Sequence, residues 1–299
     1  MFTAALAASR YFAPEIRQAF AAPETPHGLD HPFFKQVKNH PEVIAHRGGA
    51  GEWPGETLFA YQQAVKAGVD VLEMDVYMTK DDELVLMHNP TVNKTTNGKG
   101  LIATKTVKQL QQLDAGYSWS DDGQKTFPFH GKGITVPTLK EIFEAFPDMR
   151  MNIEMKEATK SPVARLCGLI QEHNMTDRVL VASFSTKYLQ AFRQACPNVA
   201  TSASTGELLQ FLSKNSLVVH SSFKPKSDAL QMIEKILGHR VVTQEFVKKV
   251  HRLNMPLHTW TVDPVAEMNR MIRVGVDGII TNYPTRLLKI LGRFTTQNP

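Results

Sequence analysis

Short apolar segments alternate with longer amphipathic segments through most of the chain, from residue 42 onward. The short segments predict strands, and apolar residues spaced three and four apart predict helices. We expect strands at 42–46, 70–78, 83–88, 151–156, 178–183, 199–202, 257–262 and 278–281. We expect helices at 57–66, 106–113, 138–146, 162–172, 185–195, 243–253, 264–273 and 284–291. Such alternation is typical of a parallel sheet covered by helices.

About eight strands in roughly 250 residues favour an α/β fold whose sheet closes into a (β/α)8 TIM-like barrel. An open, doubly wound sheet is the alternative, but no glycine-rich phosphate turn follows the first strand. Only residues 78–83 lie between the second and third strands, too few for a crossover helix, so we expect a tight turn or a distorted arrangement there. Residues 89–137 form a long loop insertion after the third strand, which in a barrel would lie beside the active site.

The first 40 residues differ from the rest, and we predict an N-terminal helical extension (1–40) followed by one barrel domain (41–292). Residues 1–22 favour a short amphipathic helix that packs on the domain or lies on a membrane surface. A signal peptide is disfavoured because no basic residue precedes Arg10. No segment has the length and apolarity of a membrane span. We therefore expect a cytoplasmic protein, with peripheral membrane contact as the alternative.

Composition narrows the class of protein. With 42% hydrophobic and 21% charged residues, the chain is an ordinary globular mixture rather than a disordered, collagen-like or coiled-coil protein. The formal net charge is +5, but the basic residues are scattered, so we expect anionic small molecules or lipid surfaces as partners and no nucleic acid. Cys167 and Cys196 have no metal-site or redox-motif spacing, which predicts two small buried residues in a reducing compartment. The oligomeric state stays open.

Chemistry-bearing residues lie at the ends of the predicted strands, where barrels carry their active sites. His46 and Arg47 directly follow the first strand and are followed by two glycines that permit close backbone approach. His46 titrates near neutral pH, and the planar fork of Arg47 suits a phosphate. His88 ends the third predicted strand in the same way.

Acidic residues interrupt two otherwise apolar strands. Glu73 and Asp75 are two residues apart and therefore share one face of their strand, as do Glu154 and Lys156 on another. Buried carboxylates are costly unless they are paired or bind a cation, and oxygen ligands suit Mg²⁺ or Ca²⁺. The alternatives are an edge-strand salt bridge for the first pair and an internal Glu–Lys pair for the second.

Seven motifs follow one another along residues 42–290. They are His46-Arg-Gly48, Pro54-Gly-Glu-Thr-Leu58, Leu72-Glu-Met-Asp75, His88, Ile153-Glu-Met-Lys156, Trp260-Thr-Val-Asp263 and Gly275-Val-Asp-Gly-Ile-Ile-Thr-Asn-Tyr-Pro284. In this order they resemble the glycerophosphodiester phosphodiesterase family. The resemblance implies a phosphodiesterase barrel of the kind found in phosphatidylinositol-specific phospholipase C.

The resemblance also implies roles for individual residues. The implied acid/base pair is His46 and His88, the implied ligands of Mg²⁺ or Ca²⁺ are Glu73, Asp75 and Glu154, and the implied substrate-binding residues are Arg47, Lys156 and Trp260. His258, two residues before Trp260, is a weaker candidate for the site. Three positions depart from the family pattern, namely Glu56, Asn89 and Asn282, and the shift of the motif's glutamate to position 56 leaves its role open.

The implied reaction is metal-dependent hydrolysis of small glycerophosphodiesters to an alcohol and glycerol 3-phosphate, with one histidine as acid and the other as base. A second hypothesis is lysophospholipase D or phospholipase C-like cleavage of lipids such as lysophospholipids, helped to a bilayer by Arg286, Lys289 and Arg293. A third is a phosphate-binding barrel without catalysis, and a purely structural protein is the fourth. Chelation and a substrate panel separate these hypotheses.

Overall fold

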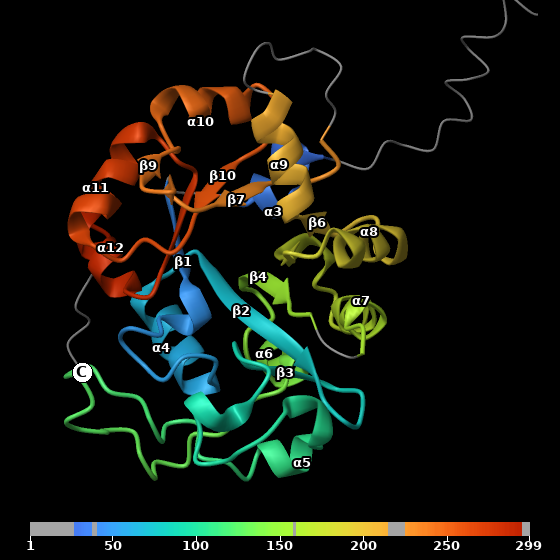
Figure 1. Cartoon of the computed structure of the whole chain (residues 1–299), viewed down its shortest axis with the longest axis vertical. Coiled ribbons are helices and arrows are strands. Elements are labelled where there is room, and N and C mark those ends of the chain that lie inside the picture. The colour runs from blue at the N-terminus through green and yellow to red at the C-terminus, as the bar shows by residue number, and fades with distance from the viewer. Residues whose placement is uncertain (1–26, 38–40, 158–159, 215–224, 295–299) are drawn as a thin grey trace, which may run out of the picture.

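Eight parallel strands form the centre of the molecule in the computed structural model, which describes residues 27–37, 41–157, 160–214 and 225–294 (Figure 1). The strands are β1 (Glu42–Ala45), β2 (Val71–Met78), β4 (Arg150–Met155), β5 (Val179–Ala182), β6 (Ala200–Thr201), β7 (Leu230–Met232), β10 (Leu257–Thr259) and β11 (Gly278–Thr281). They pair in the order β6-β5-β4-β2-β1-β11-β10-β7. A parallel bridge between Ser202 and Ala229 joins the two ends of this path. The predicted TIM-like barrel is therefore confirmed.

Helices cover the outside of the ring and connect successive strands. They are α4 (Leu58–Ala67), α6 (Leu139–Ala145), α7 (Val163–Glu172), α8 (Thr186–Ala195), α9 (Thr205–Lys214), α10 (Gln244–His251), α11 (Val265–Val274) and α12 (Pro284–Ile290). Thr57 caps the start of α4, and Gly68, at a positive φ of 88°, ends it. Thr138 and Glu141 form a capping box at the start of α6. The sequence did not predict α9.

The third predicted strand exists but lies outside the ring. β3 (Leu84–Leu86) pairs antiparallel with the far end of β2, because the short link between them permits only a tight turn. The eighth position of the barrel is taken by β7, which the sequence analysis missed. An additional antiparallel hairpin, β8 (Lys235–Ile236) and β9 (His239–Arg240), follows β7. The predicted number of barrel strands was therefore right, but the segment 83–88 is not one of them, and β7 takes its place.

The insertion after β3 has its own small core. It contains α5 (Val107–Leu110) and three-residue 3₁₀ turns at Val92–Lys94 and Ile102–Thr104. Its buried apolar residues pack against the outer end of β2 and β3, and they include Val92, Ile102, Leu110, Ile134 and Val136. In Figure 1 the insertion runs in green along the lower edge of the molecule.

Part of the predicted N-terminal extension covers the end of the barrel at which the parallel strands begin. A 3₁₀ turn (Gly28–Asp30) leads into α3 (Pro32–Lys35), whose Phe33 and Phe34 are buried against residues from five barrel strands. The amphipathic helix expected at 1–22 lies outside the described residues. Within the part of the chain that the structure describes, no helix reaches the length and apolarity needed to cross a bilayer.

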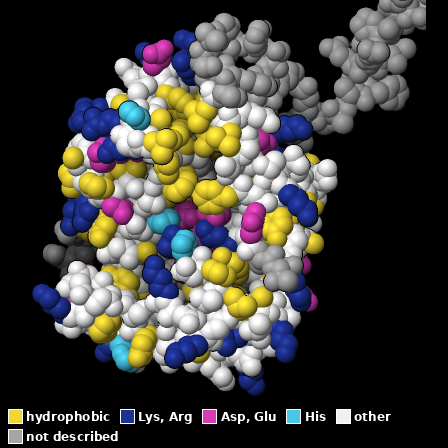
Figure 2. Space-filling view, in the orientation of Figure 1, with side chains coloured by type: hydrophobic (Ala, Val, Ile, Leu, Met, Phe, Trp, Pro, Cys, Tyr) yellow, Lys and Arg dark blue, Asp and Glu magenta, His cyan; other side chains and the backbone are white. Residues whose placement is uncertain are grey.

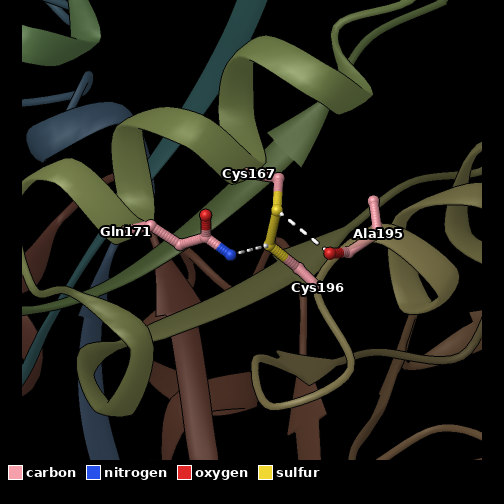
Figure 3. Close-up of a disulfide and its surroundings, with 4 residues drawn as sticks. All are labelled: Cys167, Gln171, Ala195 and Cys196. Atoms are coloured by element: carbon pink, nitrogen blue, oxygen red, sulfur yellow. Dashed lines mark hydrogen bonds between the residues drawn. A yellow bond between two sulfur atoms is a disulfide. The ribbon is translucent and has the colours of Figure 1, made fainter.

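The two cysteines form a disulfide, which corrects the prediction that they are unpaired (Figure 3). Cys167 lies in α7, and Cys196 directly follows α8, with 5.9 Å between their Cα atoms. Gln171 Nε2 approaches Cys196 Sγ at 3.8 Å. Both cysteines are buried, as expected. Because stable disulfides are typical of oxidising compartments, the pairing removes the argument for a reducing one.

We expect removal of this disulfide to destabilise the fold without changing the site, which it does not touch. The bond closes a loop over a sequence separation of 29 residues, and loss of such a constraint costs about 3 kcal/mol of unfolding free energy. The double variant Cys167→Ala/Cys196→Ala should therefore melt roughly 6–12 °C below wild type. Thermal melts with and without a reductant measure this, and reductant should have no effect on the double variant. Two titratable thiols in the native protein would contradict the pairing.

Candidate active site

The register between β2 and β4 brings the acidic side chains together. Asp75 lies beside Glu154 in the ladder, and Glu73 lies beside Asn152. Residues paired in a parallel ladder and those two apart on one strand project from the same face. Ligand oxygens of Glu73, Asp75 and Glu154 consequently lie within 4.8 Å of one another. This is the carboxylate set that the sequence predicted.

Two cationic side chains compensate part of this negative charge. Lys156 Nζ lies 2.8 Å from Asp75 Oδ1 and 2.6 Å from Glu154 Oε1. Arg47 Nε lies 3.1 Å from Asp75 Oδ2, although without hydrogen-bond geometry. Burial alone would raise the pKa of Asp75, but the charges of Lys156 and Arg47 outweigh burial and lower it. Asp75 is therefore the carboxylate of the cluster that ionises most readily.

The other two carboxylates are less easily ionised. Burial and the charge of Asp75 raise the pKa of Glu73 well above its usual range, and the same two causes raise the pKa of Glu154. Conversely, burial would lower the pKa of Lys156, but Asp75 and Glu154 raise it. The cluster thus has more carboxylates than its cationic side chains can balance.

His46 and Arg47 sit in a tight turn (His46–Gly48) immediately after β1. Arg47 has a positive φ of 54°, which strains a non-glycine residue and is concentrated at functional sites. This conformation directs the Arg47 backbone N–H to Glu73 Oε2 at 2.8 Å. His46 Nε2 lies 3.9 Å from the same carboxylate oxygen. Burial, followed by the charge of Arg47, lowers the pKa of His46 to about 4, so its ring is neutral at neutral pH.

His88 reaches the site although its strand lies outside the barrel. β3 runs back along the protruding end of β2, and the Met87 backbone N–H donates to the Asp75 carbonyl at 3.0 Å. His88 therefore lies near the level of Asp75. It is about half-buried, and burial together with the charge of Arg47 lowers its pKa. The two imidazoles face the same cavity.

Glu56, whose role the sequence left open, supports β2 from the side. β1 ends at Ala45, so the Asp75 backbone N–H has no neighbouring strand on that side and donates instead to Glu56 Oε1 at 3.0 Å. Tyr61 donates its hydroxyl to Glu56 Oε2 at 2.8 Å. A positive φ of 60° gives Glu56 this direction. Burial and the charges of Asp75 and Glu73 raise its pKa well above the usual range.

A cavity of about 210 Å³ opens over these groups. One side carries the charged residues His46, Arg47, Glu73, His88, Glu154 and Lys156, and the other carries apolar Phe184, Leu208 and Trp260 among small polar residues. Figure 2 shows acidic, histidine and basic side chains meeting near the centre of this face, with hydrophobic side chains on the side of α9 and α10. Trp260, implied as a substrate-binding residue, lines the cavity, and its ring packs edge to face with Phe184 at 5.7 Å between ring centroids. His258 does not, since it is buried near Glu42 inside the barrel.

Sequence reasoning assigned no role to three polar residues around the site, Asn152, Asp263 and Asn282. Asn152 lines the cavity, is 3% exposed, and its Oδ1 has no hydrogen-bond partner. Its position two residues before Glu154 on the same strand face could have identified it. Asn282 Oδ1 lies 2.7 Å from His46 Nδ1, and Asp263 receives a hydrogen bond from Asn282. No sequence spacing indicates that Asp263, Asn282 and His46 lie together, because their contacts depend on the register of β1 and β11.

The donor set fits a divalent cation of the hard, oxygen-preferring kind. Three carboxylates converge, and the excess of negative charge already described is costly in a buried site without a cation. Asp75 Oδ2 is buried and lacks a hydrogen bond. The residues that would hold the cation are Glu73, Asp75 and Glu154, and oxygen ligands of this type suit Mg²⁺ or Ca²⁺.

Fold and site together define a β/α-barrel enzyme with a phosphodiesterase type of centre. The family model described as "Glycerophosphoryl diester phosphodiesterase family" matches residues 46–286. The chain belongs to this family of phosphoric diester hydrolases.

A sequence relative agrees with this assignment, and two solved structures agree with the fold. A glycerophosphodiester phosphodiesterase from Caldanaerobacter subterraneus subsp. tengcongensis is 34% identical over 256 residues, covering 83% of this chain and 97% of the relative. The crystal structure of the glycerophosphoryl diester phosphodiesterase domain of an uncharacterized Mycobacterium tuberculosis protein superposes with a TM-score of 0.76 at 22% identity, covering 85% and 100% of the two chains. An Oleispira antarctica phosphodiesterase, solved in complex with the product sn-glycerol-3-phosphate, has a TM-score of 0.68 at 23% identity, covering 84% and 97%.

Proposed function

We propose that the chain hydrolyses glycerophosphodiesters to an alcohol and sn-glycerol 3-phosphate in a reaction that depends on a divalent cation. One observation carries this proposal. Two imidazoles, two cationic side chains and the carboxylates of Glu73 and Glu154 line one cavity, and Asp75 belongs to the same carboxylate cluster. All seven residues lie in β2 or β4 or shortly follow β1, β3 or β4. Non-catalytic phosphate binding would need the cations but neither the imidazole pair nor the excess of carboxylates.

Two histidines supply the proton transfers. His46, neutral and with Nε2 directed toward the cluster, accepts the proton of the attacking hydroxyl, which is the substrate's own or that of water. His88, the less buried of the two rings, donates a proton to the leaving alkoxide from its protonated form, although burial and the charge of Arg47 lower its pKa. Each positioned group of this kind contributes about 10²–10⁴-fold to the rate.

Binding and charge compensation fall to the other residues. Arg47 and Lys156 neutralise phosphate oxygens, and Asn152 Oδ1, which lacks a partner, accepts a hydrogen bond from a substrate hydroxyl. A divalent cation held by Glu73, Asp75 and Glu154 would supply the remaining positive charge beside the phosphodiester. Trp260 forms an apolar wall against the carbon chain of the substrate.

Hydrolysis of sn-glycero-3-phosphocholine tests the proposal. The purified chain is incubated with this substrate and Mg²⁺ or Ca²⁺, and sn-glycerol 3-phosphate and choline are quantified together. We expect both products in equal amounts. Phosphocholine and glycerol as products would assign the other P–O bond, and binding without turnover would support the non-catalytic barrel.

Cleavage of lysophospholipids is a second candidate, which the apolar side of the cavity favours. Phe184 is 55% exposed at the cavity, and Leu208 and Trp260 continue the same wall. A hydrocarbon chain would bury this wall at about 25 cal/mol per Å². The same side chains support peripheral contact with a lipid surface. The basic C-terminal residues support it less, because Arg293 forms an ion pair with Asp70, which precedes β2 at the opposite end of the barrel.

If this wall holds an acyl chain, Phe184→Ala should lower kcat/KM for lysophosphatidylcholine several-fold more than for glycerophosphocholine. The comparison uses both substrates with both enzymes under one set of conditions. Leu101→Ala is the matched control, since Leu101 is 49% exposed but does not line the cavity. Equal losses on the two substrates would leave glycerophosphodiesters as the proposed class.

A further inference from the structure

His46 and Asn282 are the first residues beyond two paired strands. β1 and β11 pair through Ala45 and Thr281, so the next residue of each strand lies side by side at the carboxyl-terminal edge of the barrel. His46 Nδ1 lies 2.7 Å from Asn282 Oδ1. Asn282 Nδ2 in turn donates to Asp263 Oδ2 at 2.8 Å. Two successive hydrogen bonds thus connect the carboxylate of Asp263, in the loop after β10, through Asn282 to the imidazole of His46.

The orientation of the Asn282 amide follows from the way Asp263 is held. Asp263 Oδ1 accepts from the Asn282 backbone N–H at 2.9 Å and from Thr281 Oγ1 at 3.0 Å. Arg286 donates to the Asp263 carbonyl at 2.8 Å. Asp263 Oδ2 is therefore left to face the amide, and an ionised carboxylate oxygen can only accept. The amide nitrogen must face Asp263, and the amide oxygen must face His46.

This orientation determines which nitrogen of His46 carries the proton. An amide oxygen cannot donate, so Nδ1 of the neutral ring must be the donor and Nε2 keeps its lone pair. Nε2 is the nitrogen on the side of Glu73 and the cavity. Neither Asn282 nor Asp263 lines the cavity. Their influence on the reaction therefore has to pass through the ring.

We propose that Asp263 and Asn282 are positioning residues that hold His46 in the tautomer protonated on Nδ1, so that Nε2 is ready to accept a proton. The proposal rests on the proposed function for the proton that Nε2 accepts, but the tautomer itself is a property of the protein without substrate. The contribution of Asp263 is to fix which end of the Asn282 amide faces the ring.

A single substitution should reverse this arrangement. In Asp263→Asn, the side-chain oxygen still receives the bonds from the Asn282 backbone and Thr281, so the new amide nitrogen faces Asn282. Asn282 must then turn its own oxygen toward position 263 and its nitrogen toward His46. His46 Nδ1 becomes an acceptor, and the proton moves to Nε2, where it blocks proton acceptance.

Exchanging the two residues should restore the original state. In Asp263→Asn/Asn282→Asp, the amide at position 263 donates to the carboxylate at position 282, which accepts from His46 Nδ1. The pair then contains the same two side-chain types in reversed order, with the proton again on Nδ1. A role in stability alone predicts no such recovery of the tautomer.

Nuclear magnetic resonance of ¹⁵N-histidine-labelled protein measures the tautomer directly at neutral pH. His46 signals are assigned by their absence in His46→Gln. We expect protonated Nδ1 and unprotonated Nε2 in wild type, the reverse in Asp263→Asn, and the wild-type pattern in the double variant. In parallel, kcat on glycerophosphocholine should fall about 10²-fold or more in Asp263→Asn, with KM little changed, and should recover at least tenfold in the double variant.

Each outcome decides the proposal. Any one of three results would overturn the proposal: protonated Nε2 in wild type, an unchanged tautomer in Asp263→Asn, or no recovery of the tautomer in the double variant. If Asp263→Asn fails to fold, the wild-type spectrum still tests the proposal. Failure of the proposed function is recognised separately. In that case wild type does not hydrolyse the substrate, while the tautomer still responds to the two substitutions.

Discussion

Replacing either His46 or His88 with alanine should lower kcat on glycerophosphocholine by about 10²–10⁴-fold, because each variant lacks one of the two proton-transfer groups. Both variants should remain folded. His46 makes one side-chain hydrogen bond that the structure shows, to Asn282, and its loss costs about 1 kcal/mol. His88 is only half-buried, and its contact with the Asn89 side chain is long, at 3.4 Å.

Steady-state kinetics and thermal melts on the same preparations separate catalysis from stability. His239→Ala is the matched control, since His239 is exposed in the β8–β9 hairpin and lies away from the cavity. It should behave like wild type in both measurements. Full activity of His46→Ala or His88→Ala would show that the remaining imidazole suffices, and the two-histidine mechanism would then be wrong.

The position of the site could be predicted because parallel strands converge in a predictable way. The carboxyl ends of β1, β2 and β4 share one edge of the barrel whatever the order of the strands, so the edge that carries the site could be predicted. The close approach of Arg47, Glu73, Asp75, Glu154 and Lys156 depends in addition on β1, β2 and β4 being neighbours, which the sequence does not show. His88 reaches the same edge although β3 is not a barrel strand, because β3 runs back antiparallel along the carboxyl-terminal part of β2.

Features that depend on tertiary contacts could not be predicted. The segment of β3 has the same apolar pattern as a barrel strand, and only its pairing distinguishes the two. β7 has the sequence Leu230-Gln-Met232 and, unlike the equally short β10, is not followed by one of the seven motifs. The pairing of Cys167 with Cys196 requires α7 and α8 to lie side by side, which the spacing of the cysteines does not show. Likewise, Asp263 and Asn282 meet through a loop and a register rather than through a motif.

Loss of the cation should have an effect as large as loss of a histidine, and it should appear in stability as well as activity. Excess chelator should abolish turnover, and Mg²⁺ or Ca²⁺ should restore it. Because a ligand that binds only the folded state stabilises it, a concentration 100 times Kd should raise the unfolding free energy by about 2.7 kcal/mol. Unchanged turnover in chelator, or no rise in Tm with either cation, would contradict the proposed ligand set.

Two single substitutions in this cluster should change the stability of the cation-free protein in opposite directions. Glu73 has a raised pKa, so its ionised form is disfavoured in the folded state, and Glu73→Gln removes that cost while keeping an oxygen for the Arg47 N–H. Asp75 has a lowered pKa, and Asp75→Asn removes the charge that Lys156 and Arg47 stabilise.

Without added cation, Glu73→Gln should therefore melt at or above wild type and Asp75→Asn below it, while both lose the cation-induced rise in Tm and most of the activity. The exposed Asp122 in the insertion supplies the control, as Asp122→Asn should keep the cation response. If Glu73→Gln and Asp75→Asn were destabilised alike and still responded to Ca²⁺ or Mg²⁺, these carboxylates would be structural rather than ligands. A cation site predicts different Tm shifts for the two variants without cation, and loss of the cation-induced rise in Tm in both. Such a site lowers the stability of the cation-free protein because function requires its carboxylates to lie close together.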